Sequence, residues 1–268
     1  MSLCKPFSAK FPAVLFAFAA MPVSANMRAP IHIERASSEL RAMPANLRVL
    51  NEVLEFRCPK AYIGKPDFKA LAERFCTVRV LYRVSAGTAA QVNLVFVFAG
   101  NGAVVWKHGG KSFRSTPSAL QLPEKKACTY CPDDVKRVNS AEQKIELTAG
   151  INEIEVNYDQ ALSYDESGHS YFSDGSWWQG FSYELWPIAE WQWAPDFSAE
   201  LTFSVAARSG FLGIGYADDS LKCRIAENGD HTDLLLNVGK VSGGRRTARA
   251  RISLKTRPQR LFCSYAAD

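Results

Sequence analysis

In CTVRVLYRV, residues 76–84, apolar and polar side chains alternate almost without exception. Side chains of a β-strand point to opposite faces with a period of two residues. The cysteine, the three valines and the tyrosine would therefore share one buried face, while the threonine and the two arginines would face water. A strand that is buried on one face only is typical of an antiparallel sheet.

The same alternation continues on both sides of this stretch. It recurs over residues 54–58, 145–147, 154–158, 201–205, 221–225, 234–238 and 252–254. The run 92–98 is apolar on both faces after its second residue, as in a central strand. Helix signals are limited to two turns over 66–75 and one turn after Pro132. The pattern predicts an all-β protein of one or two antiparallel β-sandwich lobes with few short helices.

Two turn signals predict hairpins. Asn101-Gly102 favours a type I′ turn, which needs positive φ at both central residues, and would join 92–98 to 104–106. Ala149-Gly150 would join 145–147 to 154–158 in the same way.

Residues 1–25 predict a secretory signal peptide. Lys5 and Lys10 accompany an apolar run that ends at the small-residue cleavage site Val23-Ser24-Ala25. No later stretch is long and apolar enough to cross a bilayer, so no transmembrane segment is expected after cleavage. The expected location is the periplasm of a Gram-negative bacterium, with an extracellular location as the alternative.

The remainder divides at a polar segment. Residues 159–176 are rich in Ser, Asp and Gly, and predict a linker or long loop. An N-terminal β-sandwich lobe would then span 26–158, and a C-terminal β-rich lobe would span 159–268 and include a Trp-rich crossing segment. Removal of the leader lowers the formal net charge from +5 to +3, which argues against a dedicated nucleic-acid binder.

Six cysteines remain after the leader, and an even number in an exported chain predicts disulfides. They are Cys58, Cys76, Cys128, Cys131, Cys223 and Cys263. Four of them share the apolar face of their strands and can meet in a core. We therefore expect the pairs Cys58–Cys76 and Cys223–Cys263, which leaves the other two to pair locally.

Aromatic residues gather in one segment. The candidate binding residues there are Trp177, Trp178, Tyr183, Trp186, Trp191 and Trp193. Such rings can stack on sugars or anchor a protein partner. They can equally fill the junction between two sheets, because large aromatic residues dominate most cores.

A basic run near the C-terminus provides a second candidate surface. A strand over 247–257 would display Arg249, Arg251, Lys255 and Arg257 in one outward stripe. The stripe could meet an anionic polymer or lipid head group of the cell envelope. The alternative is a solvated strand face that discourages edge pairing.

The sequence contains no complete catalytic signature, and two weaker patterns remain. Cys128-Thr-Tyr-Cys131 has the spacing of a redox pair or of half a zinc site, but its flanking prolines and the lack of a second ligand pair favour a structural disulfide. Asp165, Glu166, His169 and Asp174 form an acidic, His-containing loop beside the tryptophans, which a polar loop explains most simply. The sequence predicts no metal and no cofactor.

Residues Gly150-Ile-Asn-Glu-Ile-Glu-Val-Asn-Tyr158, followed by Phe181-Ser-Tyr-Glu-Leu-Trp-Pro187 and Trp191, resemble bacterial exported β-sandwich proteins that have no assigned activity. The resemblance covers the middle third of the chain. It implies the fold and the compartment, and it carries no catalytic residues.

The leading hypothesis is a non-enzymatic exported protein that binds or supports an envelope protein or glycan. The first alternative is an envelope glycan hydrolase that uses Glu184 or Asp174 beside the aromatic residues. The second is a thiol oxidoreductase that uses Cys128 and Cys131.

Overall fold

The computed structural model describes residues 26–31, 47–62, 69–70, 73–98, 102–119, 139–167, 176–184, 192–207, 220–227, 230–253 and 260–266. Its strands are β1 (Asn26–Ile31), β2 (Leu47–Cys58), β3 (Phe75–Ala86), β4 (Ala90–Phe98), β5 (Val104–His108), β6 (Lys111–Ser115), β7 (Ser118–Ala119), β8 (Asn139–Leu147), β9 (Gly150–Ala161), β10 (Ser163–Ser167), β11 (Ser176–Glu184), β12 (Gln192–Ala206), β13 (Ser220–Glu227), β14 (Asp230–Asp233), β15 (Asn237–Val238), β16 (Arg245–Ser253) and β17 (Arg260–Ala266). The predicted all-β class is confirmed.

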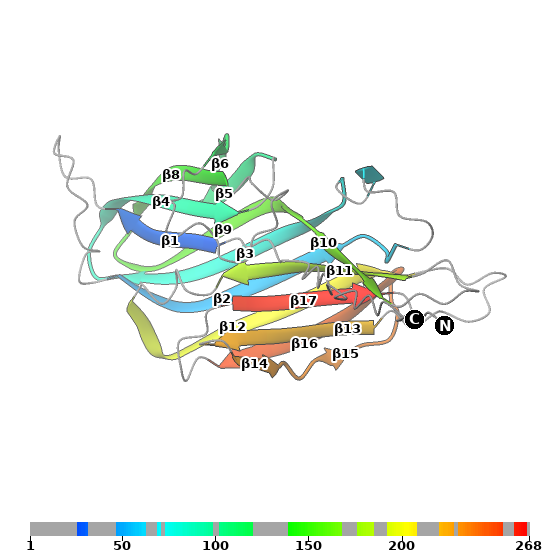
Figure 1. Ribbon diagram of the computed structural model, residues 1–268. Helices are drawn as coiled ribbons and strands as arrows, with labels where there is room; N and C mark the ends of the chain where they lie inside the picture. The colour runs from blue at the N-terminus through cyan, green and yellow to red at the C-terminus, as the bar shows by residue number, and fades with distance from the viewer. Residues whose placement is uncertain are drawn as a thin grey trace, which may run out of the picture.

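The strands form three sheets (Figure 1). An eight-stranded sheet has the order β15-β16-β12-β2-β3-β9-β5-β6, a five-stranded sheet the order β10-β11-β17-β13-β14, and a four-stranded sheet the order β1-β4-β8-β7. Neighbouring strands are antiparallel, with one exception: β2 and β12 run parallel in the middle of the largest sheet. This pairing joins β2, from the predicted N-terminal lobe, to β12, from the predicted C-terminal lobe. The division into two lobes between residues 158 and 159 stays a prediction.

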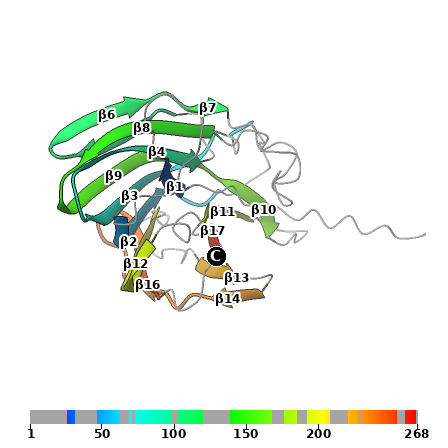
Figure 2. The ribbon, with the colours of Figure 1, turned by 90° about the vertical axis from the view of Figure 1, so that its left-hand side faces the viewer.

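Both smaller sheets cover the same face of the eight-stranded sheet, which curves around them (Figure 2). The five-stranded sheet packs on one half, where Phe181 of β11 stacks on Phe56 of β2 with ring centroids 4.1 Å apart. The four-stranded sheet packs on the other half, where Phe96 of β4 lies 4.8 Å from Tyr158 of β9. The aromatic residues therefore fill two adjoining sandwich cores that share one large sheet.

Neither predicted hairpin forms. β4 pairs with β1 and β8 in the four-stranded sheet, whereas β5 pairs with β6 and β9 in the eight-stranded sheet. Likewise, β8 lies in the four-stranded sheet and β9 lies in the eight-stranded sheet. In each case the chain crosses from one sheet to the other, because apolar strands such as β4 and β5 bury their aromatic side chains against each other from opposite layers. The rings of Phe96 and Trp106 illustrate this, with centroids 6.2 Å apart.

A tight hairpin lies one strand further on. β5 and β6 are joined by Gly109 and Gly110, whose φ angles of 55° and 75° are those that a type I′ turn requires.

One further local prediction differs from the structure, and another is confirmed in part. The polar segment 159–176 is predicted to be a linker or long loop, but β9 continues to Ala161 and β10 occupies Ser163–Ser167, where it pairs with β11. A polar sequence can form a strand there because β10 lies at the edge of its sheet. Of the helix expected over 66–75, the described part contains one turn at Lys69 and Ala70, and Phe75 already begins β3.

Within the described part of the chain, no helix is long and apolar enough to cross a membrane.

Both predicted disulfides form. Cys58 bonds to Cys76, and Cys223 bonds to Cys263. Each bond joins neighbouring antiparallel strands of one sheet, β2 to β3 and β13 to β17. Cys128 and Cys131 lie outside the described residues.

Candidate functional site

The outer face of the eight-stranded sheet is polar. In β2 the buried positions alternate with half-buried or exposed ones, so that Leu54 and Phe56 point into the core while Glu55 and Arg57 point away from it. The same alternation in β3, β9, β12 and β16 extends this outer face across the sheet. The smaller sheets cover only the opposite face, so the side chains of the outer face can meet a partner.

One half of this outer face is neutralised by ion pairs. Lys107 Nζ lies 2.7 Å from Glu155 Oε1, and Arg79 bridges Glu155 Oε2 at 2.8 Å and Glu55 Oε1 at 3.1 Å. Burial alone would raise the pKa of Glu155, but hydrogen bonds from Lys107, Asn157 and Arg79, together with the charge of Arg79, lower it to about 2. These charges are already satisfied within the protein and offer little to an ionic ligand.

The other half carries arginines. We call it the arginine face, and it consists of Arg57, Arg245, Arg249 and Arg251. Arg57 lies on β2 beside Ser204 of β12, and the other three lie on β16, the next strand along. The strand rise of about 3.3 Å per residue puts Arg245 and Arg251 roughly 20 Å apart along β16. Ser204, Thr202 and Thr247 lie between the arginines in register.

The cations of the arginine face have no carboxylate partner among the described residues. The guanidinium of Arg245 donates to the carbonyl oxygens of Cys58 and Ser204, each at 2.8 Å. Burial and then the neighbouring charge of Arg57 lower the pKa of Arg245. Arg251 donates to Ser198 Oγ at 3.2 Å, while Arg57 and Arg249 are exposed and make no ion pair within the described ranges. Glu200 of β12 lies opposite Arg251 in register but forms no ion pair with it among the described residues. Four cations against this one carboxylate leave the arginine face with an excess of positive charge.

The sequence predicted half of this surface. Arg249 and Arg251 lie on the outer face of β16 as expected, with Ala248 and Ile252 buried on the inner face. Lys255 and Arg257 lie outside the described residues. Arg57 was missed because it is nearly 200 residues away in sequence, and only the parallel pairing of β2 with β12 brings it close.

The aromatic segment is divided by its strand. Trp178 and Tyr183 both lie on β11 but point to opposite faces: Trp178 is half-buried on the outer face, and Tyr183 is fully buried. Tyr183 thus packs in the core and presents no ring to a partner. Trp177 and Trp193 lie on β11 and β12 with side chains that are not described, and Trp186 and Trp191 lie outside the described residues. Binding through those four stays a prediction.

The carboxylates of the hydrolase hypothesis are not described. Asp174 and His169 lie outside the described residues, and Asp165, Glu166 and Glu184 lie on strands whose side chains there are not described. The distance between two such carboxyl groups, on which that hypothesis depends, therefore stays untested.

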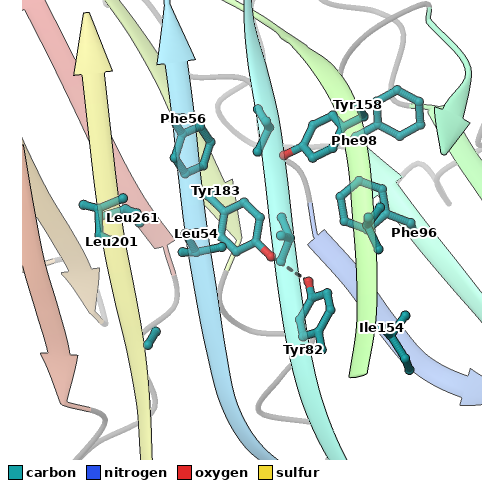
Figure 3. Close-up of a cluster of buried hydrophobic side chains, with 14 of the residues drawn as sticks. Leu54, Phe56, Tyr82, Phe96, Phe98, Ile154, Tyr158, Tyr183, Leu201 and Leu261 are labelled. Carbon is teal, nitrogen blue, oxygen red and sulfur yellow. Dashed lines mark hydrogen bonds between the residues drawn. The ribbon is translucent and has the colours of Figure 1, made fainter. Parts of the chain in front are cut away.

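A buried acid is the feature that sequence reasoning missed. Glu52 of β2 has 0% exposure, and its Oε1 accepts a hydrogen bond from the Tyr183 hydroxyl at 2.5 Å. The Tyr183 hydroxyl oxygen in turn lies 2.7 Å from the Tyr82 hydroxyl oxygen, and the dashed line in Figure 3 marks this hydrogen bond. Burial raises the pKa of Glu52 to about 8, although hydrogen bonds from Tyr183 and Tyr82 act in the opposite direction. Because Glu52 has no exposed surface, we assign it to the core.

No family model matches this chain, and no curated protein matches it.

Among solved structures, a Legionella pneumophila protein described as a "putative nutrient binding protein" matches 91% of this chain and 72% of its own length, with 10% identity and a TM-score of 0.48. An M1 zinc metallopeptidase from Deinococcus radiodurans matches 81% of this chain at 11% identity and a TM-score of 0.37. Leukotriene A4 hydrolase from Saccharomyces cerevisiae matches 82% at 7% identity and a TM-score of 0.37. The chain spans 42% and 29% of those two enzymes. Likenesses this distant carry no argument about activity or ligand.

Proposed function

We propose that this protein is an exported, non-enzymatic binding protein of the cell envelope, and that it holds an acidic glycan on the arginine face. The observation that carries the proposal is the contrast across one sheet face. Arg79 and Lys107 are paired with carboxylates at 2.7–3.1 Å, whereas Arg57 and Arg249 have none among the described residues.

Unpaired arginines close together repel one another, and their repulsion is relieved when an anion binds between them. The guanidinium group is planar and always charged, and it recognises carboxylate and phosphate groups through two parallel hydrogen bonds. A sheet face about 20 Å long favours an extended polymer over a single small anion. The hydroxyl groups of Thr202 and Thr247 between the arginines are suited to the neutral hydroxyls of sugars.

Export is supported by two features. The first 25 residues have the pattern of a signal peptide. The disulfides Cys58–Cys76 and Cys223–Cys263 are typical of proteins that fold in an oxidising compartment.

The proposal predicts that Arg57→Ala together with Arg249→Ala weakens binding of oligogalacturonate by about tenfold or more, since each charge-assisted hydrogen bond contributes about 1.5 kcal/mol or more. The measurement is isothermal titration at pH 7 in about 50 mM salt, where the Debye length exceeds 10 Å. Binding by the native protein should fall steeply as salt is raised.

Arg114→Ala is the matched control, because Arg114 is an exposed arginine on β6, at the opposite edge of the same sheet. A phosphorylated oligosaccharide in a parallel titration distinguishes phosphate from carboxylate recognition. Equal loss in the control and the double variant, or equal affinity for a neutral xylo-oligosaccharide, would reject the arginine face as the binding site.

A further inference from the structure

The outer face of the five-stranded sheet carries a second surface, on the other side of the molecule from the arginine face. In β11 and β17 the residues Phe181, Leu261 and Cys263 are buried, so their sequence neighbours point outward. Five residues with outward-pointing side chains form what we call the docking face: Trp178, Lys222, Arg224, Leu235 and Phe262.

Register brings these residues together. Arg224 of β13 lies opposite Phe262 of β17, and Lys222 lies opposite Ser264. Leu235 follows Leu234, whose backbone N–H donates to the carbonyl oxygen of Cys223 at 2.8 Å. Continuing the antiparallel register of β13 and β14 by two residues beyond Arg224 and Asp233 sets Leu235 beside Lys222.

Leu235 is the most exposed large apolar side chain among the described residues, at 92%. Its neighbours Leu234 and Leu236 pack against the core, so alternation along this segment directs Leu235 into water. Single exposed apolar residues are common and mean little. Here, however, Leu235 shares a face with two half-buried aromatic rings, Trp178 and Phe262.

The two cations of the docking face lie over those rings. Lys222 Nζ is 4.8 Å from the centroid of the Trp178 ring, and Arg224 Cζ is 5.4 Å from that of Phe262. Between the two pairs lies Gly180, which pairs with Ser264, and a Cβ at Gly180 would lie 3.0 Å from the carbonyl oxygen of Cys263. Aromatic rings together with an arginine are typical of protein interfaces.

We propose that the docking face binds a partner protein segment that carries acidic residues next to apolar ones. Charge complementarity favours acidic residues in the partner. Lys222 and Arg224 are both exposed, and neither forms an ion pair among the described residues, although Asp233 lies opposite Arg224 in register. Leu235 favours a protein over a glycan, because an aliphatic side chain offers sugar hydroxyls no hydrogen bond. This interaction is independent of glycan binding on the arginine face.

A library of random 12-residue peptides displayed on phage tests the proposal with the full-length protein as bait. The selected peptides are expected to combine Asp or Glu with aromatic or aliphatic residues. Synthetic copies should bind the Trp178→Ala, Leu235→Ser double variant at least about tenfold more weakly than the native protein, as expected when anchor residues at the centre of an interface are truncated. Ile151→Ser is the matched control, because Ile151 is an exposed apolar residue of β9, at 57% exposure, away from this face.

Charge reversal provides a second readout. Lys222→Glu together with Arg224→Glu should switch the selected peptides from acidic to basic, which a merely structural role of these exposed residues would not do. Peptides without acidic enrichment, or with equal affinity for native protein and double variant, would overturn the proposal. It would also fail if a glycan array gave binding that required Trp178 but not Leu235, or if sedimentation showed that the docking face serves self-association.

Discussion

Replacing Glu52 by Gln is expected to increase the stability of the protein relative to the native chain as the pH rises. The difference in free energy of unfolding should grow by about 4 kcal/mol between pH 5 and pH 8.5, given that one pKa unit corresponds to about 1.4 kcal/mol. The cause is the buried carboxyl, because burial raises its folded-state pKa to about 8 from its ordinary value of 4.5.

The direction of the effect follows from proton binding. Between these two pKa values the folded protein holds the Glu52 proton while the unfolded chain has released it, so unfolding releases a proton and becomes easier as the pH rises. The stabilising contribution of the neutral acid is complete below pH 4.5 and is lost as the pH approaches 8. A glutamine has the same shape and no charge, so it removes this loss.

The groups around Glu52 cannot compensate its charge. Tyr183 and Tyr82 hydrogen-bond to it, and the pKa values of Tyr82, Tyr158 and Tyr183 are all raised well above normal, by burial and then by the Glu52 charge. No described cation contributes to its pKa. An ionised Glu52 would therefore sit among neutral rings, with Oε2 lacking a hydrogen-bond partner in the described structure.

Urea unfolding followed by tryptophan fluorescence at pH 5, 7 and 8.5 measures this difference. Glu155, whose lowered pKa of about 2 gives the opposite dependence at acid pH, is present in both proteins and cancels. Glu55→Gln on the outer face of the same strand is the control. Because it removes only a surface ion pair with Arg79, it should change stability by about 1 kcal/mol or less. Parallel stability curves for native protein and E52Q would mean that Glu52 is already ionised in the fold.

Glu52 also shows what the sequence contained and how it was overlooked. Residues 52, 54, 56 and 58 share one phase of β2, and that phase is buried throughout. Glu52 is therefore a charged residue at a position where the alternation of β2 calls for an apolar one. The clear apolar alternation of β2 begins only at Leu54, because Asn51 and Glu52 are both polar, and the pattern of Leu54, Phe56 and Cys58 therefore does not extend to Glu52.

Period-two burial was enough for the strands and for the inward cysteines, because both depend on local geometry. It was not enough for sheet membership. Asn101-Gly102 has the residues of a type I′ turn, yet β4 and β5 belong to different layers, since burying Phe96 against Trp106 outweighs a local turn preference. Gly109-Gly110 carried an equally good signal between shorter, more polar strands, and there the hairpin forms.

The candidate surfaces depend even more on long-range pairing. Alternation alone predicts that Arg249 and Arg251 face outward. It cannot predict that β2 pairs in parallel with β12, which adds Arg57 to them. The docking face likewise needs the register of β17 between β11 and β13, which sets Phe262 opposite Arg224.

The Cys223–Cys263 bond connects this register to stability. Replacing both cysteines by Ala is expected to lower the free energy of unfolding by about 4 kcal/mol, because the bond closes a loop across a sequence separation of 40 and removes chain entropy from the unfolded state. The same change at Cys58 and Cys76, with a separation of 18, should cost about 3 kcal/mol. Denaturant unfolding of the two double variants at pH 6 tests which variant loses more free energy of unfolding.

The two bonds should also differ in what else they affect. Cys223 and Cys263 lie directly opposite each other on β13 and β17, and their neighbours Lys222, Arg224 and Phe262 form part of the docking face. Loss of this bond should therefore weaken binding of the selected peptides as well as stability, whereas loss of Cys58–Cys76, which joins β2 to β3, should affect stability alone. If both variants bound peptide like the native protein, the disulfide would act only on the unfolded chain. A larger loss of stability from the shorter loop would instead mean that strain or packing in the folded sheet, rather than chain entropy, determines what each bond contributes.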